Sequence, residues 1–100
     1  DDLADACLFS MNNIKASHIY NNLKLSHLNI GTGIDITIKE LAQIIKEIIK
    51  YDGKIVFDTS KPNGTPQKLL DMRITNQIGW SSKINFTEGL TKIINNYNKN

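Results

Sequence analysis

The chain has 100 residues, of which 40% are hydrophobic, and a formal net charge of +2. This length suits one modest domain with a single core. The charges of both signs are mixed and form no basic block, which argues against a nucleic-acid partner. No apolar run approaches the ~18 residues that span a bilayer, so no membrane segment is expected. The opening residues Asp1 and Asp2 are unlike the basic start of a secretion signal, so we expect a cytoplasmic protein.

Apolar residues recur at helical spacing near the start of the chain and predict a helix over about residues 2–13. Cys7 lies in this run, where a buried and inert thiol is expected. A single cysteine excludes an internal disulfide and fits a reducing compartment. Residues 12–26 are rich in asparagine and predict an irregular connector. His18 and His27 have no partners at ligand spacing, so no metal site is predicted.

The middle of the chain alternates strand and helix signals. Residues 27–31 and 54–58 are rich in branched and aromatic residues and predict strands, and residues 34–36 form a second strand-like patch. Between them, Thr37 and Glu40 form a capping box that opens a helix of about 14 residues with one apolar face. Strand, helix and strand at this spacing predict a parallel βαβ unit. The expected fold class is therefore α/β, with flanking helices.

The second half of the chain predicts a loop and two helices. Residues 59–67 contain both prolines and read as a loop. Asp71 can cap a short helix over residues 72–78, which Gly79 would end in the left-handed conformation. Residues 85–88 form a second capping-box sequence and open the final helix.

Two patterns match dinucleotide-dependent dehydrogenases without the context that such enzymes need. Tyr20 and Lys24 spell Y-x-x-x-K, in which the lysine lowers the pKa of a proton-donating tyrosine. They stand in a polar connector rather than in a helix beside a nicotinamide, so they are not interpreted as catalytic. Residues 31–33, Gly-Thr-Gly, lack the third glycine of a dinucleotide fingerprint and read as a tight turn. The chain is therefore expected to hold no catalytic, cofactor-binding or metal-binding residues.

Three lysines stand near the predicted loop over residues 59–67. Lys54 begins a predicted strand, and Lys61 and Lys68 bracket the Pro/Gly segment after it. Loops at strand ends often carry ligands in α/β proteins, and a lysine there can meet a phosphate as a point charge. Solvated surface lysines are the alternative interpretation.

Several segments stand in an order found in one enzyme family: residues 1–6, 27–33, 37–42, 54–58, 61–71 and 79–80. The most specific is Lys-Pro-Asn-Gly-Thr-Pro-Gln-Lys-Leu-Leu-Asp, residues 61–71. With these segments the chain resembles, over nearly its whole length, the GDP-L-fucose synthase family. These are NADP-dependent epimerase-reductases among the extended short-chain dehydrogenases.

The resemblance implies that residues 1–100 are the C-terminal substrate-binding domain of a larger enzyme. Its NADP(H) loop, its Ser/Tyr/Lys reductase set and its Cys/His epimerase pair would lie upstream, in an N-terminal Rossmann domain. Cys7 and His27 do not match that Cys/His pair, so the fragment alone is expected to be inactive. The parent enzyme would be a bacterial homodimer that acts on a GDP-4-keto-6-deoxy sugar in nucleotide-sugar biosynthesis.

The resemblance assigns substrate-binding roles to three residues. Lys68 matches a lysine expected near the GDP diphosphate, and Lys54 matches a basic contact that is usually arginine. Asp71 stands where related epimerases hold a nucleotide ribose, although helix capping explains it equally well. Two alternatives stay open: a stand-alone sugar-nucleotide binding or interaction module, and a fragment of a non-reducing epimerase or dehydratase.

Overall fold

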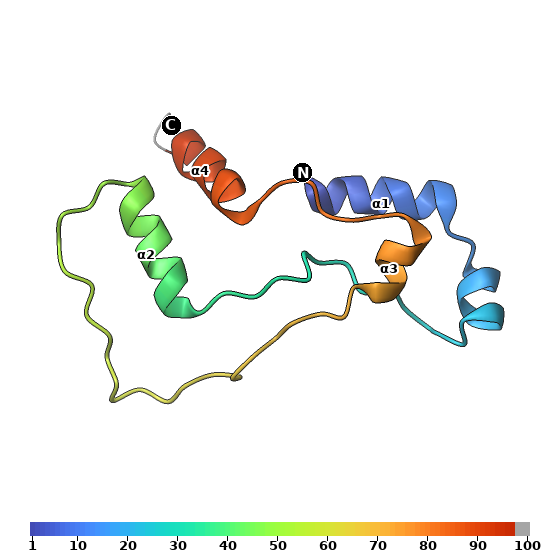
Figure 1. Cartoon of the computed structure of the whole chain (residues 1–100), viewed down its shortest axis with the longest axis horizontal. Helices are drawn as coiled ribbons and strands as arrows, with labels where there is room; N and C mark the ends of the chain where they lie inside the picture. The colour runs from blue at the N-terminus through green and yellow to red at the C-terminus, as the bar shows by residue number, and fades with distance from the viewer. Residues whose placement is uncertain (98–100) are drawn as a thin grey trace. The chain divides into compact units, whose positions relative to one another are not determined.

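The regular elements of the chain are helices joined by extended segments (Figure 1). The computed structural model describes residues 1–97. In chain order the elements are α1 (Asp2–Asn13), the π-helix η1 (His18–Asn22), α2 (Ile38–Ile48), α3 (Arg73–Ile78) and α4 (Phe86–Tyr97). No helix of the described part is long and apolar enough to cross a membrane.

The chain divides into two compact units. Unit 1 comprises Asp1–Ile34 and Leu69–Lys83, and so contains α1, η1 and α3. Unit 2 comprises Asp35–Lys68 and the segment from Ile84 onward, and contains α2 and α4. The chain passes from unit 1 to unit 2, back to unit 1 and again into unit 2, so each unit is assembled from two segments distant in sequence.

Unit 1 has a small core against one face of α1. Ala6, Met72 and Trp80 are buried, and Phe9 and Ile30 pack against them. Ala6 and Phe9 share a face of α1 because they are three residues apart on a helix. The predicted helix over residues 2–13 is confirmed, and its core contacts come from the segments around residues 30, 72 and 80.

Asp5 connects α1 to the segment that follows α3. The buried Trp80 donates its indole N–H to Asp5 Oδ2 at 2.9 Å, and Lys83 Nζ donates to the same oxygen at 3.1 Å. The Trp80 hydrogen bond, followed by the Lys83 contact, lowers the pKa of Asp5. Lys83 N also donates to Asp2 Oδ2 at 3.0 Å. The indole N–H of the buried Trp80 therefore has a hydrogen-bond acceptor in Asp5.

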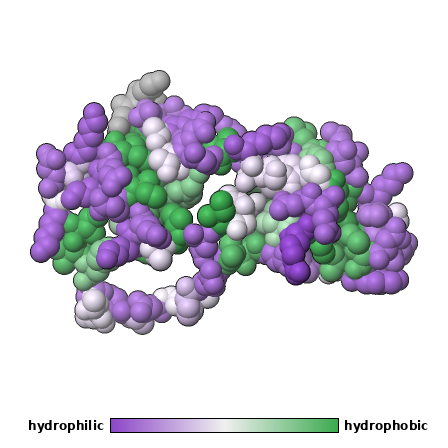
Figure 2. Space-filling model, viewed as in Figure 1, coloured by the Kyte–Doolittle hydropathy of each residue, from purple (hydrophilic) through white to green (hydrophobic). Residues whose placement is uncertain are grey.

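The opposite face of α1 is also apolar, and it is exposed. Leu8 and Met11 are 62% and 82% exposed on this face. Cys7 is exposed as well, so the expectation of a buried thiol is wrong. Successive residues of an α-helix are rotated by about 100° about its axis, so Cys7 lies away from the buried Ala6 and on the side of Leu8 and Met11. Figure 2 shows other apolar residues, in green, at the surface.

The α3 helix lies almost where the sequence predicts it. It covers Arg73–Ile78, and Gly79 follows at φ 116°, in the left-handed region that a residue with a Cβ adopts at a cost. Asp71 Oδ1 accepts a hydrogen bond from Arg73 N at 3.0 Å, which satisfies a free donor of the first turn. Met72, not Asp71, occupies the N-cap position, so Asp71 bonds the first amide of the helix from one residue before the cap.

In unit 2, the capping box predicted at the start of α2 is present. Thr37 Oγ1 accepts from Glu40 N at 3.1 Å, and the Glu40 carboxylate accepts from Thr37 N at 2.7 Å. The helix contains 11 residues, and none of them is buried. It contacts α4, at whose start Asn85 Oδ1 accepts a hydrogen bond from Glu88 N at 2.9 Å.

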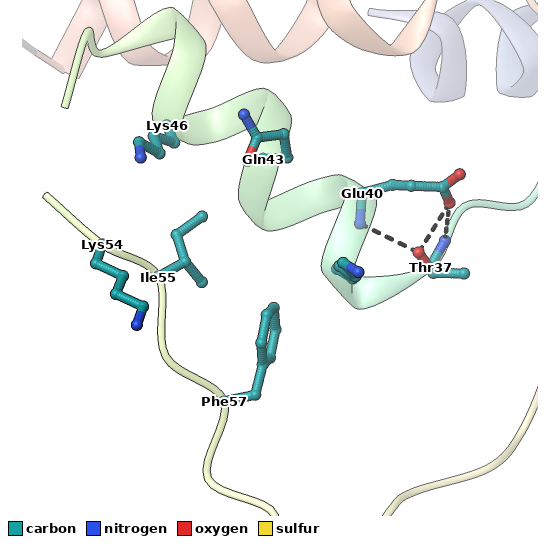
Figure 3. A pocket seen from close by; sticks show the side chains of 8 residues that line it. Thr37, Glu40, Gln43, Lys46, Lys54, Ile55 and Phe57 are labelled. Atoms are coloured by element: carbon teal, nitrogen blue, oxygen red, sulfur yellow. Dashed lines mark hydrogen bonds between the residues drawn. The ribbon is translucent and has the colours of Figure 1, made fainter. Parts of the chain in front are cut away.

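The predicted strands are not confirmed within residues 1–97. A strand needs a hydrogen-bonded neighbour, and the segments 27–31, 34–36 and 54–58 run without strand pairing in the described structure. One of them keeps the side-chain alternation of a strand: Ile55 and Phe57 point toward α2 in Figure 3, whereas Val56 is 78% exposed. The expected βαβ unit is therefore not present as a paired sheet.

The connector predicted over residues 12–26 is more regular than expected. It contains η1, and Ile19 within this π-helix is buried. Among residues 1–97, no cluster of His, Cys, Asp and Glu side chains could hold a metal ion.

Candidate functional site

Unit 2 contains two pockets that share Thr37 and Glu40 at the start of α2. The first has a volume of about 590 Å³ and contains Lys54, and the second has a volume of about 770 Å³ and contains Lys68. The structure therefore brings two of the three predicted substrate-binding residues to adjacent pockets of one unit. Both lysine side chains are exposed, as a contact to an incoming ligand requires.

The first pocket lies between one face of α2 and the extended segment after Gly53 (Figure 3). Its helical wall consists of side chains three to four residues apart, which lie along one face of a helix. The opposite wall is Ile55 and Phe57, whose side chains point toward the helix. The lining residues are Thr37, Lys39, Glu40, Gln43, Lys46, Lys54, Ile55 and Phe57.

The charges of the first pocket favour an anion. Its lining residues include three lysines, Lys39, Lys46 and Lys54, and one carboxylate, that of Glu40. The Glu40 carboxylate is already bound by Thr37 N at 2.7 Å and by Thr37 Oγ1 at 2.8 Å. These hydrogen bonds, the backbone one foremost, lower the pKa of Glu40. The cationic groups thus outnumber the one carboxylate, which is engaged in capping.

The second pocket has the opposite balance. Lys68 is its one cationic side chain, and Asp35 and Glu40 supply two carboxylates. The loop residues 65–67, Thr-Pro-Gln, form the wall next to Lys68. An anion bound here would depend on direct contact with the Lys68 ammonium, because the summed charge of the lining does not attract it.

Asp71 belongs to unit 1 and is occupied by its neighbour Arg73. Arg73 donates from Nη2 to Asp71 Oδ2 at 2.6 Å and from Nε to both carboxylate oxygens at 3.0 Å. The Arg73 hydrogen bonds lower the pKa of Asp71 from its ordinary 3.8 to about 2. The pair is exposed at its surface, 85% for the Arg73 side chain and 53% for that of Asp71. A ligand hydroxyl could reach this carboxylate by displacing a solvent-exposed guanidinium.

Sequence reasoning missed part of the first pocket. Lys39, Gln43 and Lys46 were visible only as the polar face of a helix, and their spacing of four and three residues was the available signal. The interpretation of Phe57 and Ile55 as strand residues did not reveal that they form a pocket wall. That wall depends on which helix the segment passes, and the local sequence does not specify this.

The two dehydrogenase-like patterns have local structural settings. Tyr20 lies in η1 and is 70% exposed, and Lys24 follows η1 with a φ of 56°. The turn at residues 31–33 brings Gly31 and Gly33 next to Met72, and Gly31 next to Leu70. These glycines pack against the chain itself.

Known relatives match the chain along its whole length. It is 42% identical over 100 residues to a putative GDP-L-fucose synthase 2 of Arabidopsis thaliana and 46% identical over 91 residues to the GDP-L-fucose synthase of Escherichia coli. These matches take in 100% and 90% of the chain but only 28% of either relative. The chain thus spans less than a third of the relatives that it matches, and no family model matches it.

Solved structures of GDP-heptose reductases also match nearly the whole chain. A GDP-6-OMe-4-keto-L-xylo-heptose reductase from C. jejuni superposes with a TM-score of 0.91 and 38% identity, over 99% of the chain and 29% of that structure. A GDP-mannoheptose C4 reductase from Campylobacter jejuni with NADP bound gives 0.81 and 37%, over 100% and 30%. The resemblance seen in the sequence is confirmed: this chain is a homologue of a segment of the GDP-L-fucose synthases.

Proposed function

We propose that this chain is the C-terminal substrate-binding domain of an NADP(H)-dependent reductase-epimerase that acts on a GDP-4-keto-6-deoxy sugar. The observation that carries the proposal is the match of the whole chain to GDP-L-fucose synthases at 42–46% identity, together with the superposition on a GDP-heptose reductase. The similar reductase with NADP bound supports NADP(H) as the cofactor of the parent enzyme. The parent would be a homodimer, as the resemblance implies, and would work in the cytoplasm.

In this proposal the chain binds the nucleotide of the substrate, and the reduction takes place in another part of the enzyme. Lys68 and Lys54 neutralise the diphosphate of GDP from adjacent pockets. Two ammonium groups suit a group that carries more than one negative charge. Asp71 accepts hydrogen bonds from the ribose hydroxyls once Arg73 releases its carboxylate. Binding energy gained far from the reacting carbon then orients the keto sugar.

The remaining part of the enzyme would complete the fold. We infer an N-terminal Rossmann domain that carries the cofactor loop and the catalytic residues. Its strands would pair with extended segments of this chain and produce the α/β fold that the sequence predicts. Ile55 and Phe57 point toward α2 while Val56 is 78% exposed, an alternation that is compatible with such pairing, although Phe57 is also 48% exposed.

The exposed face of α1 supports this relation to a larger protein. A helix that is apolar on both faces is stable when it is covered on both. One face covers the core around Ala6, and the other presents Leu8, Met11 and Cys7 to solvent. We assign this second face to contact with the part of the enzyme that the chain does not include, which accounts for about 72% of the relatives' length.

The test compares two loop lysines in the full-length enzyme. Lys68→Ala should raise the Michaelis constant for the GDP-sugar roughly tenfold, about 1.4 kcal/mol, and leave NADPH affinity unchanged. Lys61 is exposed and lines neither pocket, so Lys61→Ala should change the Michaelis constant less than about twofold. Equal effects from both variants, or no effect from Lys68→Ala, would overturn the proposed diphosphate contact.

A further inference from the structure

Unit 1 contains one side chain whose burial is unusual for its polarity. Thr75 in α3 is 1% exposed, and its hydroxyl donates to the backbone oxygen of Asn29 at 2.7 Å. The two residues are 46 positions apart in the chain. A buried hydroxyl costs free energy unless it is hydrogen-bonded, so this contact fixes the backbone of Asn29 against α3.

Asn29 also contacts Asp71, the residue that we propose binds the ribose. Its side-chain Nδ2 donates to the backbone oxygen of Asp71 at 3.1 Å, across 42 positions of sequence. Asp71 in turn accepts from Arg73 N at the start of α3. Asn29, Asp71 and α3 with Thr75 therefore form a closed ring of contacts, in which Asp71 is held by its carbonyl oxygen and its carboxylate.

The glycine turn next to Asn29 allows this close approach. A Cβ on Gly31 would lie 3.3 Å from Leu70 Cδ1, which is tighter than ordinary van der Waals contact. Gly33 has a φ of 74° and lies near the buried Met72. The turn at residues 31–33 thus allows Leu70 and Met72, the two neighbours of Asp71, to pack against the segment that contains Asn29.

We propose that Asn29 is a positioning residue for Asp71, and that the ring through Thr75 sets where this carboxylate stands when the nucleotide binds. The inference rests on the proposed function, because it requires a GDP-sugar at Asp71. It goes further by assigning a role to Asn29 and to the turn at residues 31–33, which are not among the proposed substrate-binding residues. Asn29 acts through its side-chain amide, which donates a hydrogen bond to the backbone carbonyl of Asp71.

The experiment measures GDP affinity by calorimetry, and kcat and KM for the GDP-sugar, in the full-length enzyme. Removing one hydrogen bond changes an equilibrium by roughly three- to tenfold, so Asn29→Ala should weaken GDP binding and raise KM by that factor with kcat unchanged. In an Asp71→Ala background the same change should weaken GDP binding less than about twofold, because the residue being positioned is gone. Asn13→Ala is the matched control, because it removes a hydrogen bond from an asparagine side chain to the backbone of α1, Asn13 Nδ2 to Phe9 O at 2.9 Å, and not one to Asp71.

A second pair of variants separates positioning from loss of stability. Thr75→Val removes the hydroxyl and keeps the shape, and it should weaken GDP binding roughly threefold or more; Thr75→Ser keeps the donor and should restore the affinity. An Asn29→Ala enzyme that loses melting temperature but binds GDP normally would overturn the inference, as would an equal loss of affinity with and without Asp71. If Asp71→Ala has no effect while Lys68→Ala does, the inference fails and the diphosphate contact stands. If neither variant weakens binding, both fail.

Discussion

At the scale of single residues, Asp71 combines contacts that the structure describes with a binding role that is proposed. Helix capping and ribose binding were equally compatible with the sequence, and the structure adds a third interaction, the ion pair with Arg73. Sequence alone could predict a contact with the start of the helix, because Asp71 stands two residues before it. It could not predict that Asn29 holds the same residue from 42 positions away.

The first prediction concerns the ionisation of Asp71. Its pKa is lowered to about 2 by Arg73, so Arg73→Gln should return it toward 3.8, measured by NMR titration of the side-chain carboxyl. Because the folded pKa is depressed, its contribution to stability is present above about pH 4 and is lost as the pH falls toward 2. A pKa near 3.8 with Arg73 intact would show that the ion pair does not form.

Cys7 shows in the same way that local sequence does not determine which residues of a helix are buried. An apolar run at helical spacing predicts a helix but does not specify which face is buried when both faces are apolar. Ala6 is buried because Met72 and Trp80 pack there, and both come from the far end of the sequence. Cys7 therefore lies on the second, exposed face of α1.

At the scale of elements, local signals predicted helix ends well and strands poorly. The capping box at Thr37 and Glu40 and the left-handed Gly79 need only neighbouring residues, and both are confirmed. A strand is defined by pairing with another segment, so residues 54–58 can carry the side-chain alternation of a strand without forming one among the described residues. The pocket walls depend on such long-range placement too.

The second prediction tests the capping box. Thr37→Ala should destabilise α2 by about 1 kcal/mol, because Glu40 N loses its acceptor, and Thr37→Ser should retain most of the stability. Amide hydrogen exchange in the full-length enzyme, without ligand, reports this locally: the first turn of α2 should exchange faster and α3 should not. Unchanged protection in Thr37→Ala would mean that the side-chain cap does not stabilise the helix.

At the scale of the whole molecule, the chain exposes more large apolar side chains than it buries. Its fully buried apolar residues within the described part are few, whereas α1 alone exposes three large ones. A domain with so small a core is marginal by itself. The resemblance predicts this, because it implies a larger enzyme around the chain, whereas the composition is that of an ordinary globular domain.

The third prediction concerns the exposed face of α1. Leu8→Lys should lower the melting temperature of the full-length enzyme by several degrees, because a charge would enter a covered apolar contact. The same change in the isolated chain should leave its helix content unaltered, since Leu8 is 62% exposed there. Asn76→Lys, on an exposed position of α3, is the control and should have little effect in either protein. Equal melting temperatures for both full-length variants would show that this face of α1 stays in solvent.

The most direct measurement is NADPH oxidation with GDP-4-keto-6-deoxymannose, followed by absorbance for the isolated 100-residue chain and for the full-length enzyme that contains it. The full-length enzyme should oxidise NADPH only when the GDP-sugar is present, whereas the isolated chain should not exceed the buffer blank and should not bind NADPH. Turnover by the isolated chain, or a full-length enzyme that is indifferent to GDP-sugars, would contradict the assignment of this chain to substrate binding in a GDP-sugar reductase.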